Sequence, residues 1–250
     1  MPRLSAIVIT INEAANIADC LDSVAFCDER IVVDCGSSDE TVAIAQGKGA
    51  RVVFHDWDGF GAQKNFALSL AEGDWVLSLD ADERVSPELA EAIKAALADP
   101  SADGYEFPRS SSFCGRPMRH SDWYPDYVLR LFRRGKARFT DVTIHERVIC
   151  DGIVKRLSPS LIHHPVLKLE DALSRVDRYS TAGAAAIVKS GRRVSFMTGI
   201  GHGLAAFLRT YVLRAGFLDG AEGFLLAVAN AEGSYYRYMK AWLAMRHRGR

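Results

Sequence analysis

W-V-L-S-L-D-A-D-E, residues 75–83, is the stretch that decides the predicted fold. Its apolar first part indicates a buried strand, because a short apolar run after Gly73-Asp74 has the length of a strand. Its acidic second part then lies where the strand leaves the sheet, which is where open α/β sheets bind ligands. Asp80 and Asp82 are spaced so that both carboxylates could contact one Mg²⁺ or Mn²⁺ ion. An acidic loop before a helix at Ser86-Pro87 is the alternative, and this stretch alone does not separate the two.

The composition indicates a globular protein. The chain has 250 residues, of which 48% are hydrophobic and 25% charged, enough for one large α/β domain or one domain with an appendage. No signal-peptide pattern precedes the first apolar run. The cysteines are scattered and form no C-x-x-C pair, which predicts a reduced, cytoplasmic protein without disulfides or a zinc site. They are Cys20, Cys27, Cys35, Cys114 and Cys150.

The charges are unevenly distributed along a chain of zero net charge. Residues 182–250 hold ten Lys and Arg against three Asp and Glu, whereas residues 1–181 hold 21 against 28. A basic region on an otherwise acidic protein indicates an anionic partner, such as a nucleic acid, a phospholipid or a phosphorylated acceptor.

The first hundred residues alternate between short apolar runs and helical patterns. Strands are predicted at 5–10, 30–33, 51–54 and 75–79, and helices after residue 13, near residue 40, and at 60–71 and 87–98. This alternation is typical of a parallel sheet with crossover helices. No G-x-G-x-x-G follows the first strand, so the dinucleotide-binding fingerprint is missing.

The pattern changes after Pro100. Strands are predicted at 104–109, 128–133 and 137–139, and helices from Leu169 onward, including 170–187 and apolar residues at helical spacing over 204–212 and 235–242. We therefore expect one domain over 1–165 and a helical region over 166–250. The helices either pack on the sheet or form an interfacial pair on an anionic membrane. The longest uncharged apolar stretch, 194–208, is too short to span a bilayer.

Acidic and amide side chains follow three of the predicted strands. They are Asn12-Glu13, Asp34 and the pair Asp80 and Asp82. Because parallel strands end at one edge, these groups would repel one another unless they bound cations or hydrogen-bond donors. A nucleotide fits, since its base and ribose offer donors and its diphosphate needs a metal. Lys64 could pair with phosphate or base, although its spacing alone favours an exposed helix charge.

Four motifs in this half carry a resemblance. They are I-V-I-T-I-N-E (7–13), V-V-D-C-G-S-S-D-E-T (32–41), G-A-Q-K-N-F-A (61–67) and L-S-L-D-A-D-E (77–83). In this order and spacing they resemble a family 2 glycosyltransferase of the GT-A fold, a nucleotide-sugar-binding, Rossmann-like, mostly parallel sheet with crossover helices, here with a C-terminal helical extension. Cys35 departs from the family pattern, where a second Asp or a Ser is frequent.

The resemblance implies a UDP-sugar donor, a divalent cation (Mg²⁺ or Mn²⁺) and a role for each matching residue. Thr10, Asn12 and Glu13 would contact the nucleoside, and Asp34 would face the uracil edge. Lys64 would contact the uracil or the phosphate. Asp80 would bind the ribose, and Asp82 would bind the metal. Glu83 receives no role.

The second half narrows the resemblance to enzymes of the lipopolysaccharide inner core. The motifs are R-L-F-R-R (130–134), I-H-E-R-V (144–148), G-F-L-D-G-A-E-G (216–223) and Y-Y-R-Y-M-K (235–240). They resemble β-1,4-glucosyltransferases that move glucose from UDP-glucose to a core heptose. The implied acceptor is a lipid-linked saccharide rather than a nucleic acid, met by a cytoplasmic enzyme at the inner face of the cytoplasmic membrane.

An inverting transfer needs a general base near the acceptor hydroxyl. The resemblance implies Glu146 as this base, because related enzymes carry an acidic base at this place after R-L-F-R-R, with Asp126 and Asp122 as reserves. His145 would orient Glu146 or approach the metal. An ion pair of Glu146 with its neighbour Arg147 is the alternative. H-E-R-V-I lacks the second His of a zinc-protease motif. We interpret His163 and His164 as two histidines at a strand end rather than as a metal site.

Three other functions stay open at this point. A glycosyltransferase of another cell-envelope glycan or glycolipid would carry the same motifs. A nucleotidyltransferase would want a Gly-rich loop with Lys or Arg after the first strand, where this chain has T-I-N-E. A non-catalytic saccharide-binding protein would not need the D-x-D pattern or Glu146.

Overall fold

The protein is described by a computed structural model that covers residues 2–140, 147–166 and 168–248. The chain divides into two compact units. The sheet unit consists of residues 1–109 and 126–163, and the helical unit of residues 110–125 and 164–250. The sequence places the domain boundary at 165/166. The structure groups residues 110–125 with the helical unit as well.

The first half of the sheet unit alternates strands with crossover helices. Its elements are β1 (Leu4–Thr10), α1 (Ile17–Ser23), β2 (Glu29–Asp34), α2 (Thr41–Gly47), β3 (Arg51–Phe54), α3 (Phe60–Leu70), β4 (Trp75–Asp80) and, after a short strand, α4 (Pro87–Ala98). Strands β3, β2, β1 and β4 lie side by side in parallel. The predicted α/β fold with crossover helices is confirmed.

Beyond β4 the sheet becomes mixed. The order continues through β8 (Asp126–Arg133), β6 (Gly104–Phe113), β12 (Leu161–Val166) and β5 (Glu83–Val85). Strands β4 and β8, β8 and β6, and β12 and β5 are antiparallel. The strands β7 (Arg116–Pro117) and β11 (Val154–Arg156) pair with β6, and β9 (Ala137–Phe139) pairs with β10 (Val148–Cys150). The parallel pairing is thus concentrated in the first four strands.

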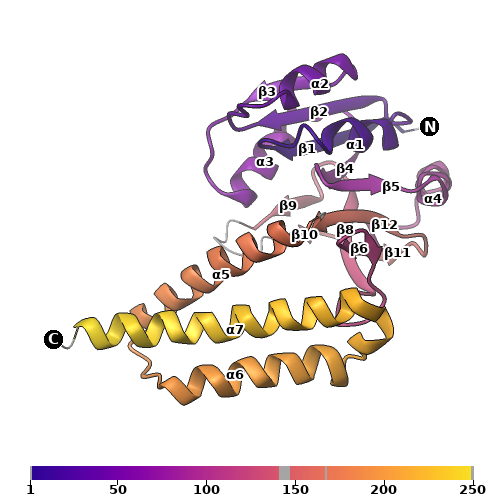
Figure 1. The fold of residues 1–250 in the computed structure, drawn as a ribbon. Helices are drawn as coiled ribbons and strands as arrows, with labels where there is room; N and C mark the ends of the chain where they lie inside the picture. The colour runs from indigo at the N-terminus through magenta and orange to yellow at the C-terminus, as the bar shows by residue number, and fades with distance from the viewer. Residues whose placement is uncertain (1, 141–146, 167, 249–250) are drawn as a thin grey trace. The chain divides into compact units, whose positions relative to one another are not determined.

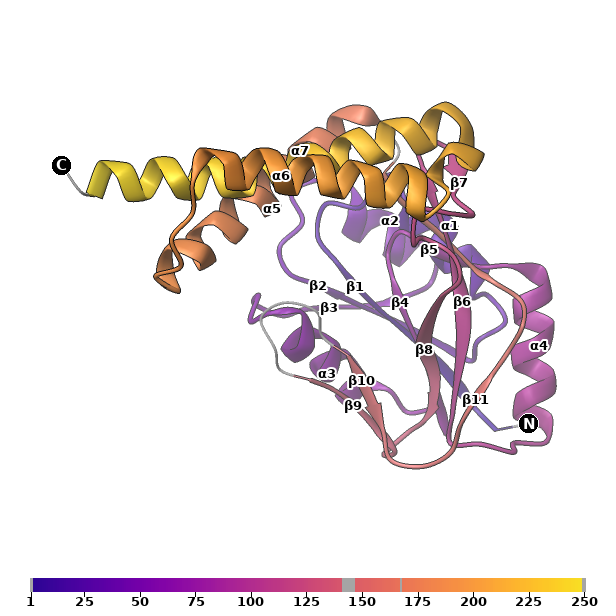
Figure 2. The same ribbon diagram turned by 90° about the horizontal axis from the view of Figure 1, so that it is seen from below.

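The alternation of side chains along β1 builds two cores, one on each face of the sheet. Ala6 and Val8 join a cluster that includes Leu89 and other residues of α4, whereas Ile7 joins a second cluster with Ala67 of α3. Figure 2 shows α3 and α4 on opposite sides of the strands. Both faces are therefore covered, which explains why the parallel strands are apolar along most of their length.

The helical unit contains α5 (Leu169–Lys189), α6 (Phe196–Leu208), the π-helical turn η1 (Arg209–Leu213), the 3₁₀ turn η2 (Gly216–Asp219) and α7 (Gly220–Arg248). The long helix α7 lies between α5 and α6 (Figure 1). The predicted C-terminal helical extension is confirmed. None of the helices in the described ranges combines the length and apolar character that a membrane span requires.

Candidate active site

The register of the parallel strands brings three predicted site residues to one edge of the sheet. Thr10 at the end of β1 is opposite Asp34 at the end of β2, and Ile9 is opposite Asp80 at the end of β4. The edge where an open α/β sheet binds ligands therefore carries a hydroxyl and two carboxylates from three strands.

Hydrogen bonds join the loops that follow β1 and β2. The backbone N–H of Asn12 donates to Ser37 Oγ at 2.8 Å, and Asn12 Oδ1 accepts from the Ser38 N–H at 2.8 Å. The Glu13 N–H donates to Thr41 Oγ1 at 2.8 Å. Asn12 has a φ of 53°, a left-handed conformation that Asn tolerates better than most residues. Asn12 and Glu13 thus shape this edge through their backbone as well as their side chains.

Asp34 and Thr10 differ in how their polar atoms are satisfied. Asp34 Oδ2 accepts from the N–H groups of Gly36 and Ser37 at 2.8 and 2.9 Å, and its Oδ1 accepts from the Ser37 hydroxyl. The loop after β2 is therefore closed around Asp34. Thr10 Oγ1 is buried without a hydrogen-bond partner within the described residues. A buried hydroxyl of this kind calls for a ligand or water to satisfy it.

Lys64 is buried and paired, so the spacing-based expectation of an exposed helix charge is wrong. Its Nζ lies 2.8 Å from Asp80 Oδ1, and Arg130 Nη2 lies 2.5 Å from Asp80 Oδ2. Burial alone would raise the pKa of Asp80, but the charges of Arg130 and Lys64 outweigh it and hold that pKa well below its ordinary value. Asp80 is thus an ionised carboxylate held between two cations.

Glu83, which the sequence left without a role, anchors this cluster. It is fully buried at the start of β5, and its Oε1 lies 2.6 Å from Arg130 Nη2. Its Oε2 accepts the Asp80 N–H at 3.0 Å. Burial lowers the pKa of Arg130, but Asp80 and Glu83 raise it above its ordinary value. Arg130 was missed as a site residue, although an arginine within the apolar run of β8 is the signal of a buried acidic partner.

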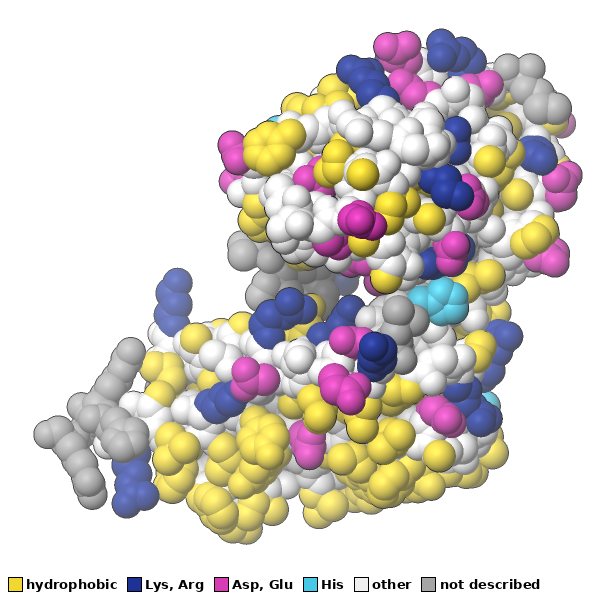
Figure 3. All heavy atoms as spheres, turned by 45° about the horizontal axis from the view of Figure 1, so that its top comes forward, with side chains coloured by type: hydrophobic (Ala, Val, Ile, Leu, Met, Phe, Trp, Pro, Cys, Tyr) yellow, Lys and Arg dark blue, Asp and Glu magenta, His cyan; other side chains and the backbone are white. Residues whose placement is uncertain are grey.

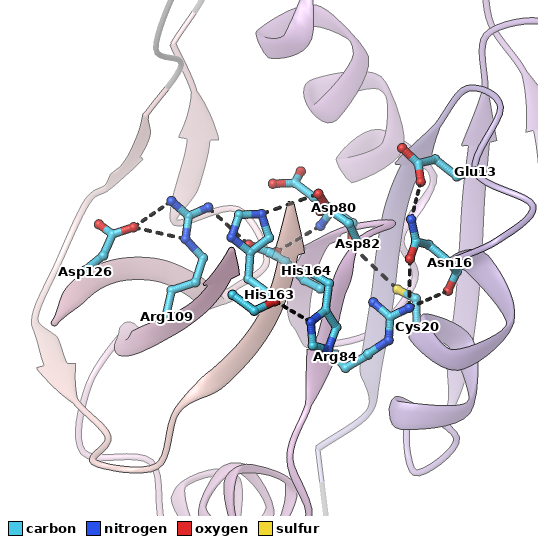
Figure 4. Close-up of polar contacts among 12 residues, drawn as sticks. Glu13, Asn16, Cys20, Asp80, Asp82, Arg84, Arg109, Asp126, His163 and His164 are labelled. Carbon is cyan, nitrogen blue, oxygen red and sulfur yellow. Dashed lines mark hydrogen bonds and ion pairs between the residues drawn. The ribbon is translucent and has the colours of Figure 1, made fainter. Parts of the chain in front are cut away.

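The candidate bases have separate surroundings. Asp126 Oδ2 accepts from Arg109 Nε and Nη2 at 3.0 and 2.6 Å in the sheet unit (Figure 4). Asp122 belongs to the helical unit, where its Oδ1 lies 3.0 Å from Arg214 Nε. Glu146 and His145 lie outside the described residues.

Asp82 faces a histidine that the sequence placed at a strand end only. His163 Nε2, on β12, lies 3.4 Å from Asp82 Oδ2, and Figure 4 shows the two side chains turned toward one another. The pairing of β12 with β5 explains the contact, since it sets His163 opposite Glu83. Histidine is a common metal ligand, so His163 itself was a signal for a metal site in the sequence. The residues next to it along the chain, however, did not indicate that it lies beside Asp82.

The sequence family described as "Glycosyl transferase family 2" matches residues 5–157, which include all of these sheet-unit contacts except His163. The chain belongs to glycosyltransferase family 2. It is therefore an enzyme that transfers a sugar. A nucleotidyltransferase and a non-catalytic saccharide-binding protein, the alternatives from other classes, are not supported.

Two relatives match this glycosyltransferase over most of its length. An "uncharacterized glycosyltransferase" of Rickettsia felis is 32% identical over 96% of this chain and 89% of its own. The "lipopolysaccharide core biosynthesis glycosyltransferase LpsC" of Rhizobium meliloti is 32% identical over 95% of this chain and 90% of its own. Among solved structures, glucosyl-3-phosphoglycerate synthase from Mycobacterium tuberculosis with Mn²⁺ and UDP aligns at a TM-score of 0.38, with 26% identity over 46% of this chain and 45% of its own.

Proposed function

We propose that this glycosyltransferase moves a hexose, glucose as the leading candidate, from a UDP-sugar to a heptose of the lipopolysaccharide inner core, with inversion at the anomeric carbon. The observation that carries the proposal is the gathering of Thr10, Asp34 and Asp80 at one sheet edge in a family 2 chain, with Asp82 in the turn that follows β4. The similarity to LpsC along nearly the whole chain supports the choice of pathway.

The donor would be held at the ends of β1, β2 and β4. The unsatisfied hydroxyl of Thr10 would bond the nucleoside, and Asn12 and Glu13 would shape the pocket around it. Asp34 would face the uracil edge, with its orientation fixed by its own loop. Lys64 and Asp80 form an ion pair, with Lys64 Nζ 2.8 Å from Asp80 Oδ1. We therefore expect a ribose or phosphate to share this pair rather than to contact a lone carboxylate.

A divalent cation fits the chemistry of Asp82 and His163. A carboxylate oxygen and an imidazole nitrogen 3.4 Å apart suit Mn²⁺, and the carboxylate alone suits Mg²⁺. Such ions are commonly bound by one or two side chains, with substrate phosphates and water as the other ligands. Within the described residues, no group of three or more His, Cys, Asp or Glu side chains is arranged to hold a metal ion by itself. When bound, the cation would stabilise the charge that develops on the departing diphosphate.

The acceptor hydroxyl would attack the anomeric carbon as the bond from that carbon to the diphosphate breaks. A base must take the hydroxyl proton within hydrogen-bond reach. Glu146 remains the proposed base, with Asp126 as the reserve in the sheet unit. The two hydrogen bonds from Arg109 orient Asp126, but both go to Oδ2 and so occupy one of its oxygens.

The acceptor would be a lipid-linked saccharide, so we place the enzyme in the cytoplasm as a peripheral protein at the inner face of the cytoplasmic membrane. The basic balance of residues 182–250 supports an anionic, phosphorylated acceptor. A glycan or glycolipid of another part of the cell envelope is the second candidate, because the family alone does not set the acceptor.

A donor and acceptor screen tests the proposal. UDP release would be measured with UDP-glucose, UDP-galactose and UDP-N-acetylglucosamine, each with a heptose-bearing core saccharide and with none. We expect acceptor-dependent release with UDP-glucose and a β-linked product by NMR. An α-linked product would contradict inversion. Transfer only to a different envelope glycan would contradict the heptose acceptor.

A further inference from the structure

Helix α6 packs against α7 through glycine. Gly199 and Gly203 are buried, and a Cβ added at Gly199 would lie 2.3 Å from Met239 Cε. At Gly203 an added Cβ would lie 3.1 Å from Tyr235 Cβ. A Cβ on Gly201 would meet nothing within 4 Å, since it lies off this contact. The face of α6 toward the protein is therefore a small-residue stripe of the Gly-x-x-x-Gly kind.

The large apolar side chains of α6 point away from that contact. Met197, Leu204 and Leu208 are 66%, 59% and 46% exposed, and they follow helical spacing. The connection to α7 continues the pattern, with Leu213 at 77% and Leu218 at 55%. We call these residues, with Phe217, the apolar edge. In Figure 3, hydrophobic side chains gather along the lower edge of the helical unit.

This distribution is the reverse of what water favours. A helix that packs in water normally buries its large apolar residues and exposes its small or polar ones. Small residues at the helix contact and large ones on the outside are typical of helices that face lipid, where close backbone packing holds the helices together. A continuous exposed patch of this kind on a protein marks an interaction surface.

The positive charges around the apolar edge indicate what kind of partner it binds. Residues 189–218 contain five Lys and Arg and no Asp or Glu. Three of the five, Arg192, Arg193 and Arg209, are exposed at the two ends of α6. A second copy of the chain docked here would place these cations against their own equivalents, which is unfavourable. An anionic surface with an apolar interior satisfies both the charges and the leucines.

We propose that the apolar edge inserts into the headgroup and upper acyl region of an anionic phospholipid bilayer, with α6 lying in the membrane plane. The flanking arginines bind lipid phosphates. This inference rests on the proposed function in one respect, the biological role of the surface. It names the surface through which the enzyme would reach a lipid-linked acceptor.

Vesicle co-sedimentation of the full chain tests the proposal. We expect binding to phosphatidylcholine vesicles that contain phosphatidylglycerol. The double variant Leu204→Asp/Leu208→Asp should bind at least about 100-fold more weakly, because two charges replace two inserted side chains. The matched control is Leu169→Asp/Leu173→Asp, two exposed leucines at the same spacing on α5, which should bind like the wild type. Equal binding by both double variants would overturn the proposal.

The charges are tested separately. Arg192→Gln/Arg193→Gln should weaken binding to the anionic vesicles by roughly 5- to 30-fold, since each basic residue near an anionic surface contributes on the order of 1 kcal/mol, a factor of about five. Binding should also weaken as salt is raised. Equal affinity for pure phosphatidylcholine vesicles would contradict the anionic bilayer as partner. So would a wild-type dimer, detected by sedimentation velocity without lipid, that is lost in Leu204→Asp/Leu208→Asp.

The same proteins separate this inference from the proposed function. Each variant is first checked for wild-type circular dichroism and for UDP release with a soluble core saccharide. Vesicle binding without transfer from any UDP-sugar would contradict the proposed function and leave the membrane surface intact. Transfer to the soluble saccharide without vesicle binding would overturn the membrane surface alone.

Discussion

Arg130 Nη2 lies 2.5 Å from Asp80 Oδ2, so a guanidinium within β8 neutralises the carboxylate at the end of β4. The same nitrogen contacts Glu83, which is fully buried. One arginine therefore holds both ends of the D-A-D-E turn and leaves Asp82 between them to face His163. Because Arg130 offsets the charges of Asp80 and Glu83, the repulsion among the three carboxylates of this turn is reduced.

Replacing Arg130 should destabilise the protein strongly. Arg130→Gln removes the nearer of the two arginines that contact the buried Glu83, leaving Arg109 Nη1 at 3.4 Å. Losing one member of a buried pair costs about 3–5 kcal/mol. Urea unfolding monitored by circular dichroism measures the change. Arg138→Gln is the control, because the Arg138–Asp151 pair is exposed and its loss should cost less than about 1 kcal/mol. Equal unfolding midpoints for the two variants would contradict the buried network.

The contribution of Asp80 to stability should depend on pH in one direction. The pKa of Asp80 is lower in the folded protein than the value of about 3.9 in an unfolded chain, so its contribution is complete above that value and declines as the pH falls below it. The difference in unfolding free energy between the wild type and Asp80→Asn should thus be constant from pH 7 to about pH 5 and shrink toward pH 3. Urea unfolding at several pH values measures it. A difference that grows on acidification would contradict the assignment.

His163 should contribute to metal binding. In His163→Ala, the affinity for Mn²⁺ in the presence of UDP should fall about tenfold or more, as measured by isothermal titration calorimetry. His164→Ala is the matched control on the same strand, because His164 Nδ1 lies 2.7 Å from Ser112 Oγ and not at Asp82. A loss of affinity in His164→Ala but not in His163→Ala would remove His163 from the site.

Glu146 should act in the chemical step and not in donor binding. Glu146→Gln should bind the UDP-sugar as the wild type does, while kcat falls by roughly 10²- to 10⁴-fold, the usual contribution of a general base. Asp126→Asn and Asp122→Asn, measured alongside, should retain most of the wild-type kcat. An unchanged kcat in Glu146→Gln would pass the role to whichever of the two aspartates lost activity.

The parallel part of the fold was predictable because its signals are local. The strand predicted at 51–54 and the helix at 87–98 match β3 and α4 residue for residue. Each apolar run is bounded by its own turn residues, and α4 begins at a Ser86 cap followed by Pro87. The short strands β5 and β12 carry no such signal. They form because they pair with each other across a long stretch of chain.

The candidate site, like the fold, was predictable where its signals lie close together in the sequence. The strand ends predicted that Asn12-Glu13, Asp34 and the pair Asp80 and Asp82 lie at one edge, since parallel strands end together. The register places Asp34 and Asp80 there, together with Thr10, which only the family resemblance had indicated. Sequence spacing gave no means of matching buried charges between distant strands, so Arg130 and His163 were missed. Likewise, the inward glycines of α6 acquire meaning only once α7 lies against them.

Sugar transfer by Asp82→Ala tests the central claim most directly. UDP release from UDP-glucose with a heptose-bearing acceptor would be measured for the wild type and Asp82→Ala, each with Mn²⁺ and with EDTA. We predict that the wild type is active only with the cation, and that Asp82→Ala loses at least about 10²- to 10³-fold of that activity, the range for removing one electrostatic contact to a developing charge. Full turnover by the wild type in EDTA, or by Asp82→Ala with Mn²⁺, would contradict the account.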